Sequence, residues 1–359
     1  MQATQWNFSA GPSQLPQLVL ASLREATDNC EGSGFSLFEL NHRSDVFLSI
    51  LEELKSRIRS LLSVPENFDI LFCPGGASLQ FAAIPMNLCT LGFRGGYIVS
   101  GFWSLKAYAE ADRISRAYIL WNGESTRLPE QPIVLPRGTD YVYYCDNETI
   151  DGKEFPYVPP VELGEATLVS DMSSNIFTRP IDWRHYGCVF ASLQKNLGIA
   201  GASLVIVDRS LYGSIGERVP AMMNWERFAR QNSLPNTAPV AAIYSALLMT
   251  RWIESEGGLA VMQERAQQRS STLYGALDEM RYFYTDLVPT AIRSRTNVVF
   301  NLPETLTSDF LRGATEAGLH GLKGHRARGG LRASLYNAMP QEGVEALVGY
   351  LKEFCQRYA

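Results

Sequence analysis

The sequence predicts an α/β fold, in which a mostly parallel sheet is covered by helices and a smaller α+β domain follows at the C-terminus. One observation is that short apolar runs alternate with helical stretches up to about residue 250, which is typical of parallel sheets buried on both faces. The other is that helices stand beside only a few strands beyond that point. We therefore expect a large domain over residues 1–255 and a small domain over residues 256–359, with the N-terminal segment as a candidate contact of the small domain.

The pattern of apolar residues predicts a scaffold helix that begins after Ser44. Ser44 and Asp45 suit a helix start, and apolar side chains then recur at helical spacing. These apolar positions are Phe47, Ile50, Leu51, Leu54, Ile58, Leu61 and Leu62. Their single stripe predicts a helix with one buried face.

Short apolar runs are predicted as the strands of the sheet. In chain order they are FDILFC (68–73), GGYIVSG (95–101), RAYIL (116–120), DYVYYC (140–145), ATLVSD (166–171), CVFASL (188–193) and ASLVIVD (202–208). Helical stretches lie between several of them, among them SLQFAAIPMNL (78–88). In a sheet of this kind ligands bind outside the carboxyl ends of the strands, so the residues that close each run are the candidates for a site.

The predicted small domain contains two helices and two strands. A long helix covers residues 257–280, and the strands are NVVFNL (297–302) and LRASLY (331–336). A closing helix follows Pro340, because proline is favoured at a first helical turn. Its apolar face consists of Val344, Leu347, Val348, Leu351 and Phe354.

Composition and charge exclude several classes of function. The chain carries 32 Lys and Arg against 37 Asp and Glu, a net charge of −5, so it has no field suited to nucleic acid. No basic n-region precedes an apolar stretch, and no apolar run approaches the roughly 20 residues of a membrane span. We therefore expect a cytoplasmic protein that contacts neither nucleic acid nor membrane. The six cysteines show no CxxC spacing, which predicts buried free thiols and no metal site.

Three strand ends together suit one cofactor. Strand 68–73 runs through Gly75 and Gly76 into a helix, an arrangement that aims free N–H groups at a phosphate. Asp171 closes one later strand and Lys195 follows another. Pyridoxal phosphate (PLP) requires a Schiff-base lysine, a carboxylate at its pyridinium nitrogen and a phosphate cradle. Trp103, just after strand 95–101, is a candidate stacking ring for it.

The chain also resembles the phosphoserine aminotransferases, which are fold-type I PLP enzymes of the class V aminotransferase group. The motifs that carry this resemblance are NFSAGPSQLP, NHRSD, CPGGAS, SGFWS, CDNETIDG, SDMSSN, QKNLG, LPNTAP and GHRARGGLRASLYNAMP. They span nearly the whole chain in family order. The resemblance implies transfer of the amino group of L-glutamate to 3-phosphohydroxypyruvate, which gives O-phospho-L-serine and 2-oxoglutarate in serine biosynthesis.

The resemblance also implies roles for residues that match the family motifs. Lys195 would be the Schiff-base lysine, Asp171 the partner of the pyridinium nitrogen and Trp103 the stacking ring. The remaining cofactor contacts would be Ala77, Ser78 and Gln194 at the phosphate, Thr149 near the ring hydroxyl, and Asn236 and Thr237 at the phosphate from a neighbouring subunit. The family pattern therefore implies a homodimer with shared active sites.

Residues 322–334, LKGHRARGGLRAS, form a basic segment with several glycines. His325-Arg326 in it repeats the His-Arg pair at His42-Arg43, and two guanidinium forks with imidazole donors suit a phosphomonoester. By resemblance these four residues bind the substrate phosphate, Arg332 binds the α-carboxylate and Ser9 is a further substrate contact. We expect Lys323 and Arg328 to be solvated charges with no specific role, and His185 and His320 to be structural or surface residues.

Two other functions fit parts of the same pattern. Another class V PLP enzyme, of the alanine–glyoxylate transaminase or cysteine desulfurase type, would keep Lys195 and Asp171 but would need no phosphate cluster. A non-catalytic anion-binding protein would use neither residue. The sequence leaves open whether the longer phosphorylated keto acid of pyridoxine biosynthesis is also a substrate.

Overall fold

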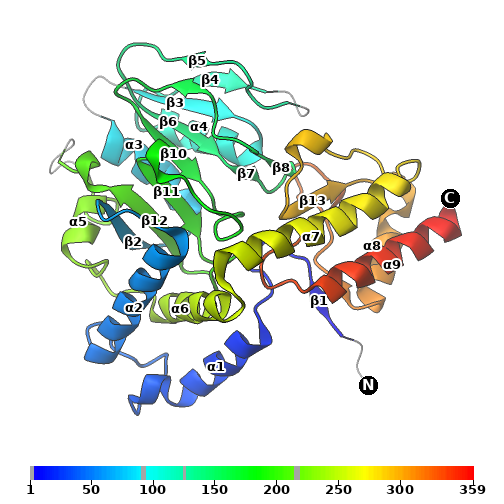
Figure 1. The fold of residues 1–359 in the computed structure, drawn as a ribbon, viewed down its shortest axis with the longest axis horizontal. Helices are drawn as coiled ribbons and strands as arrows, with labels where there is room; N and C mark the ends of the chain where they lie inside the picture. Colours follow the sequence, from blue (N-terminus) through cyan, green and yellow to red (C-terminus); the bar gives the residue numbers. More distant parts are fainter. Residues whose placement is uncertain (1–3, 90–93, 124–126, 214–218) are drawn as a thin grey trace.

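The computed structural model describes residues 4–89, 94–123, 127–213 and 219–359, and its centre is a seven-stranded sheet (Figure 1). In spatial order the strands are β2 (Phe68–Pro74), β12 (Ala202–Asp208), β11 (Cys188–Ser192), β10 (Thr167–Asp171), β6 (Thr139–Cys145), β3 (Arg94–Val99) and β4 (Tyr118–Asn122). Strand β12 runs antiparallel to both of its neighbours, and the other pairs are parallel. The predicted mostly parallel α/β sheet is confirmed.

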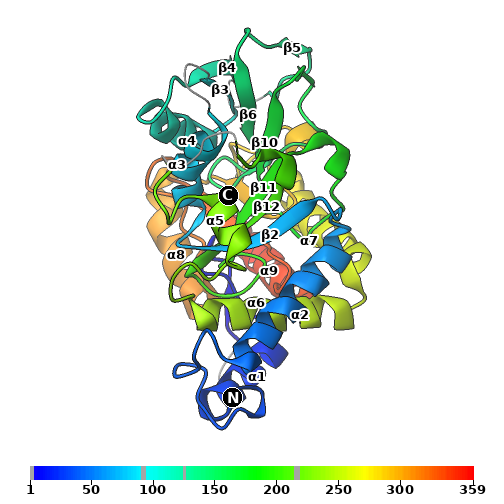
Figure 2. The ribbon, with the colours of Figure 1, turned by 90° about the vertical axis from the view of Figure 1, so that its left-hand side faces the viewer.

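Helices cover both faces of this sheet because its strands are apolar on both sides. In β2, Ile70 and Phe72 belong to one hydrophobic core, whereas Leu71 and Cys73 belong to the core on the opposite face. The first face is covered by α2 (Asp45–Leu62) and α6 (Val240–Ser255), and the second by α3 (Ala77–Leu88), α4 (Phe102–Asp112) and α5 (Trp225–Arg230). Figure 2 shows α3 and α4 on one side of the sheet and α2 on the other.

Helix α2 begins as the sequence predicts. The Ser44 hydroxyl accepts a hydrogen bond from the Phe47 amide at 3.3 Å, which satisfies one of the free N–H groups of the first turn. The predicted apolar stripe is buried except for Leu61, which is partly buried. Helix α1 (Gln17–Asp28) precedes α2 and packs on α6.

The C-terminal part of the chain has a separate hydrophobic core. Its elements are α7 (Gly258–Glu279), β13 (Asn297–Phe300), α8 (Thr307–Glu316), β14 (Leu319–His320), β15 (Leu331–Ser334) and α9 (Gln341–Tyr358). Strand β1 (Trp6–Asn7) pairs with β14, and Phe8 is buried in this C-terminal core. The N-terminal segment therefore packs with residues more than 250 positions away, while a domain boundary near residue 255 stays a prediction.

Short elements complete the described chain. They are the strands β5 (Ile133–Val134), β7 (Asn147–Glu148), β8 (Lys153–Glu154) and β9 (Val161–Glu162), and the 3-10 helices η1 (Cys30–Gly32), η2 (Trp183–His185), η3 (Arg209–Leu211), η5 (Thr290–Ile292) and η6 (Glu304–Leu306). All six cysteines are free, and five of them are buried while Cys89 is partly buried. Over the described ranges, none of the helices has the length and apolarity needed to cross a bilayer.

Candidate active site

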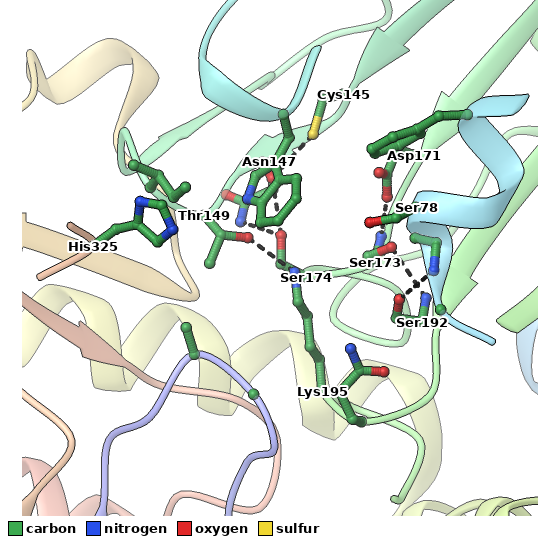
Figure 3. Close-up of a pocket in the computed structure, with 18 of the residues that line it drawn as sticks. Ser78, Cys145, Asn147, Thr149, Asp171, Ser173, Ser174, Ser192, Lys195 and His325 are labelled. Carbon is green, nitrogen blue, oxygen red and sulfur yellow. Dashed lines mark hydrogen bonds between the residues drawn. The ribbon is translucent and has the colours of Figure 1, made fainter. Parts of the chain in front are cut away.

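A cavity of about 280 Å³ opens at the carboxyl ends of the sheet strands (Figure 3). Nine of the predicted site residues line it. They are Ala77, Ser78, Trp103, Thr149, Asp171, Gln194, Lys195, His325 and Arg332. Strand ends, the start of a helix and the basic segment, all far apart in sequence, therefore meet at one pocket.

Lys195 lies in the turn after β11, near the middle of the pocket. Its ammonium donates to the Thr149 hydroxyl at 3.1 Å. The backbone of the turn is held by the N-terminal loop, since the Ser13 hydroxyl donates to the Lys195 carbonyl at 2.5 Å and the Ser13 amide donates to the Gln194 carbonyl at 3.0 Å. The position of the lysine is thus set from both sides.

Asp171 ends strand β10 with its carboxylate buried. It accepts from the Ser173 amide at 2.8 Å, and the Tyr143 hydroxyl lies 3.5 Å away. Burial raises the pKa of this carboxyl, while Ser173 and the nearby Lys195 act in the opposite direction. A carboxylate in such an apolar place is stabilised by a cationic or N–H partner in the pocket.

Helix α3 points its first turn at the same pocket. Its N-cap is Gly76, which offers no side chain to satisfy the free amides of the turn. Ser192 accepts from the Ala77 amide at 2.8 Å, and Ser78 also lines the cavity. Gly75 has a φ of 82°, a backbone conformation that strongly favours glycine. This helix start is able to hold a phosphate.

Helix α4 carries Trp103 in its first turn and is fixed by two carboxylates. Glu148 accepts from the Trp103 amide at 2.8 Å, and Asp151 accepts from the Phe102 amide at 2.9 Å. Burial, followed by the charge of Asp151, raises the pKa of Glu148 to about 7. Sequence reasoning missed both residues. The signal was present, because two acids in NETID follow a strand and a helix start attracts carboxylates.

Figure 3 shows His325 at the opposite end of the pocket from Ser78 and Ser192, with Thr149 and Lys195 between them. The His325 ring packs against Phe102 with centroids 5.1 Å apart. Burial lowers the pKa of Arg332, and within the described parts of the chain its buried Nε atom has no hydrogen-bond partner. This end of the pocket can therefore take an anion.

Other predicted residues do not line this pocket in the single chain. They are Ser9, His42, Arg43, Asn236, Thr237 and Arg326. His42 and Arg43 lie in the turn before α2, Asn236 and Thr237 lie just before α6, and Arg326 is exposed within the basic segment. Ser9 approaches Gly321 so closely that a Cβ there would lie 2.3 Å from the Ser9 hydroxyl. The roles given to these residues stay predictions.

The expectation that Arg328 is a solvated charge is wrong. Its guanidinium donates to the Asp151 carbonyl at 2.9 Å and pairs with the Asp286 carboxylate at 3.0 Å. The side chain is only 22% exposed, so Arg328 ties the basic segment to the loop after β6. Lys323, by contrast, is exposed.

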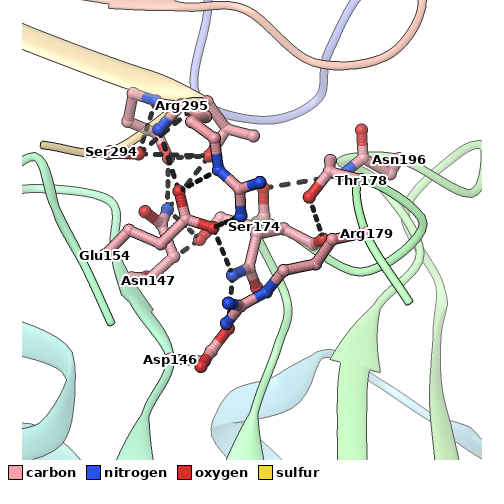
Figure 4. Close-up of polar contacts among 12 residues, drawn as sticks. Asp146, Asn147, Glu154, Ser174, Thr178, Arg179, Asn196, Ser294 and Arg295 are labelled. Atoms are coloured by element: carbon pink, nitrogen blue, oxygen red, sulfur yellow. Dashed lines mark hydrogen bonds and ion pairs between the residues drawn. The ribbon is translucent and has the colours of Figure 1, made fainter. Parts of the chain in front are cut away.

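A buried polar network lies beneath the pocket and joins the loop after β6 to the C-terminal part (Figure 4). The Asn147 amide donates to Ser174 and to Asn297, both at 2.7 Å. Glu154 accepts from Arg295 at 2.6 Å. Because unsatisfied buried polar groups are costly, this network fixes the loop that supplies Thr149. Sequence reasoning missed it, since its members are scattered along the chain.

Comparisons with known proteins agree over nearly the full chain. The family profile described as aminotransferase class-V matches residues 5–347. A phosphoserine aminotransferase from Bacillus cereus is 42% identical over 354 residues, covering 97% of this chain and 98% of that protein. One from Coxiella burnetii is 43% identical over 359 residues, covering 98% and 99%.

Solved structures give the same result. The phosphoserine aminotransferase from Bacillus circulans subsp. alkalophilus superposes with a TM-score of 0.95 at 37% identity, covering 99% of each chain. The PLP-bound phosphoserine aminotransferase from Trichomonas vaginalis superposes with a TM-score of 0.92 at 37% identity, covering 97% of this chain and 99% of that one. An alanine–glyoxylate aminotransferase from Nostoc sp. shares the fold, with a TM-score of 0.74 at 18% identity, covering 98% and 96%.

Proposed function

Because this chain belongs to the aminotransferase class-V family and, within it, to the phosphoserine aminotransferases, we propose that it transfers the amino group of L-glutamate to 3-phosphohydroxypyruvate. The products are O-phospho-L-serine and 2-oxoglutarate, and the pathway is serine biosynthesis. The observation that carries the proposal is a single pocket with Lys195 at its centre and a helix start at one end. At its other end lie basic groups that form no ion pair with any residue that the structure describes.

The residues of this pocket fit PLP. Free amides at the start of α3, together with Ser78 and Ser192, suit its phosphate. Asp171 is a buried carboxylate whose stability requires a partner such as a protonated ring nitrogen. Lys195 is the one amine among the residues that line the described pocket. When bound, PLP supplies an electron sink for the bonds at the substrate Cα.

The chain's own residues then have distinct tasks. With PLP bound, Lys195 Nζ would hold the cofactor between turnovers and would remove the substrate Cα proton, since it is an amine oriented by the Thr149 hydroxyl at 3.1 Å. Asp171 would keep a proton on the ring nitrogen of bound PLP through its charge. Trp103 offers a flat face whose backbone is fixed by Glu148.

Substrate recognition uses the opposite end of the pocket. We propose that Arg332 binds the α-carboxylate and that His325 and Arg326 bind the phosphate, with Ser9 as a further contact. The same basic groups accept the γ-carboxylate of glutamate in the other half-reaction, because carboxylate and phosphate oxygens both suit charged donors. Amination of the four-carbon phosphorylated keto acid of pyridoxine biosynthesis is an additional proposal for this site.

A homodimer with shared active sites would account for predicted residues outside the pocket. The turn with His42 and Arg43 follows a stretch with two strongly exposed rings, Phe35 at 60% and Phe38 at 76%, and exposed apolar groups of this kind favour a protein contact. Asn236 has a buried Oδ1 atom without a partner among the described residues. We propose that a second copy covers these groups and receives His42, Arg43, Asn236 and Thr237. A cytoplasmic location also stays our prediction.

The proposed function is tested with a set of keto acids and one variant pair. Glutamate-dependent amination is compared for 3-phosphohydroxypyruvate, its four-carbon analogue, pyruvate and glyoxylate, and the first is expected to be used best. Lys195→Ala should lose both turnover and the visible absorbance of the bound cofactor. Lys352→Ala, at a half-exposed lysine on α9, should keep both. A preference for glyoxylate would favour the alanine–glyoxylate alternative and contradict our proposal.

A further inference from the structure

Helix α4 places a lysine beside the pocket that the roles given above do not use. Lys106 follows Phe102 by four residues and Trp103 by three, so the three side chains lie on neighbouring positions of one helix face. The Lys106 ammonium lies 5.3 Å from the centroid of the Trp103 ring, within the range of a cation–π contact. This contact holds the ammonium beside the Trp103 ring, and Trp103 is one of the residues that line the pocket.

The neighbourhood of His325 shows which charges meet there. The pKa of His325 is lowered first by burial and then by three cations, Arg332, Arg326 and Lys106. The ring also packs on Phe102, one turn of α4 before Lys106. Basic groups from the helix and from the basic segment therefore approach one another at the same end of the pocket.

These basic groups have no carboxylate partner among the described residues. Over the described ranges, no ion pair involves Lys106, Arg326 or Arg332, whereas Arg328 of the same segment is paired with Asp286 at 3.0 Å. The carboxylates at the start of α4 are engaged by backbone amides of that helix. Like charges that converge without a counter-charge indicate a site for an anion.

His325 itself supplies a donor but little charge. Its Nδ1 atom accepts from the Ala327 amide at 3.2 Å, so in the neutral ring the proton is on Nε2. Its pKa is lowered from 6.5, which leaves the ring mostly neutral at pH 7. A phosphomonoester carries nearly two negative charges. Arg332 is proposed for the α-carboxylate, so the phosphate end needs a further cation.

We propose that Lys106 is a substrate-binding residue that contacts the distal anionic group and favours phosphate over carboxylate there. The inference rests on the proposed function and deepens it. A lysine suits this role because its point charge on a flexible four-carbon stem can follow either the phosphate of one substrate or the shorter-reaching γ-carboxylate of the other. The cation–π contact with the Trp103 ring holds the ammonium next to the pocket.

The test compares Lys106→Gln with Arg113→Gln in the PLP-bound enzyme. Arg113 lies at the other end of α4, pairs with Glu110 and is 75% exposed, so its variant removes the same charge from the same helix away from the pocket. Affinity for O-phospho-L-serine and for inorganic phosphate is measured by calorimetry. We expect Lys106→Gln to weaken both roughly ten-fold, as for loss of a charge-assisted contact, and to weaken L-glutamate binding less. Lys106→Arg should restore most of the affinity.

A second readout reports the position of Lys106 without turnover. The chain has four histidines, so the NMR signal of His325 can be identified by its loss in His325→Asn. Lys106→Gln should raise the titration midpoint of that signal, whereas Arg113→Gln should not. Equal phosphate affinity in the two variants, or an unchanged His325 midpoint, would overturn the role of Lys106. Weakened phosphate binding in an enzyme that does not aminate 3-phosphohydroxypyruvate would count against the proposed function alone.

Discussion

Glu148 offers a quantitative test of how helix α4 is held. Its carboxylate is 1% exposed and accepts from the Trp103 amide at 2.8 Å, the Ser104 amide at 2.9 Å and the Ser104 hydroxyl at 2.5 Å. The substitution Glu148→Gln keeps the shape and one acceptor oxygen but removes the charge. The variant therefore separates the effect of the buried charge from that of the hydrogen bonds.

The size of the charge effect follows from the pKa of Glu148. Burial, with the nearby Asp151, raises that pKa from 4.5 to about 7, so the folded state binds the proton more tightly than the unfolded state. The stability that this group contributes is fully present below pH 4.5 and is lost as the pH rises through 7. The difference between the pKa values in the unfolded and folded states corresponds to about 3 kcal/mol of unfolding free energy. Roughly 2.5 kcal/mol of this stability is lost between pH 5 and pH 8.

Urea unfolding of the wild type and Glu148→Gln at pH 5 and pH 8 measures this effect. The lost hydrogen bonds lower the stability of the variant by about 1–3 kcal/mol at both pH values. The variant lacks the titration, however, so its stability relative to the wild type should rise by roughly 2.5 kcal/mol between pH 5 and pH 8. Glu345→Gln, at an exposed position of α9, is the control. Parallel pH curves for wild type and Glu148→Gln would refute the reasoning.

Three further predictions concern other parts of the fold. Hydrogen bonding from Arg251 helps to hold the pKa of Glu53 at about 2. Glu53→Gln should therefore lower the free energy of unfolding at pH 7 by no more than about 1 kcal/mol, which is measured as a lower Tm. This loss of stability should fade as the pH falls from 4.5 toward 2. Gly75→Ala places a side chain on a residue with a φ of 82°, which costs about 1–2 kcal/mol of conformational energy. This variant should bind PLP more weakly in a fluorescence titration. Arg328→Ala should speed amide hydrogen exchange in the basic segment, whereas the exposed Lys323→Ala should not.

The strands were predictable from sequence because they are buried on both faces. In β2, alternate residues enter different cores, so the strand appears as a continuous apolar run rather than as an alternating pattern. The direction of β12 was not predictable in the same way. It runs antiparallel to β11 and β2, and the apolar run itself is the same for either direction.

The centre of the site was predictable because strand ends meet at one edge of a parallel sheet. Asp171 and Lys195 each follow an apolar run, and Gly75 opens the turn into a helix, so local pattern was enough to bring them together. The supports of the site were not predictable by this route. Glu148 binds the Trp103 amide across 45 positions of sequence, and no local pattern specifies which helix start a distant carboxylate will meet.

The basic segment shows why counting charges is a poor guide to an anion site. Arg326 and Arg328 are two positions apart and chemically identical, yet Arg328 is paired with Asp286 and donates to the Asp151 carbonyl, whereas Arg326 is exposed. Its pairing removes Arg328 from the charge available to a ligand. Lys106 adds to that charge although it belongs to a helix more than 200 positions earlier. The anion that this pocket prefers is therefore set by which cations the fold leaves without a partner, and that property depends on tertiary pairing rather than on the composition of any one segment.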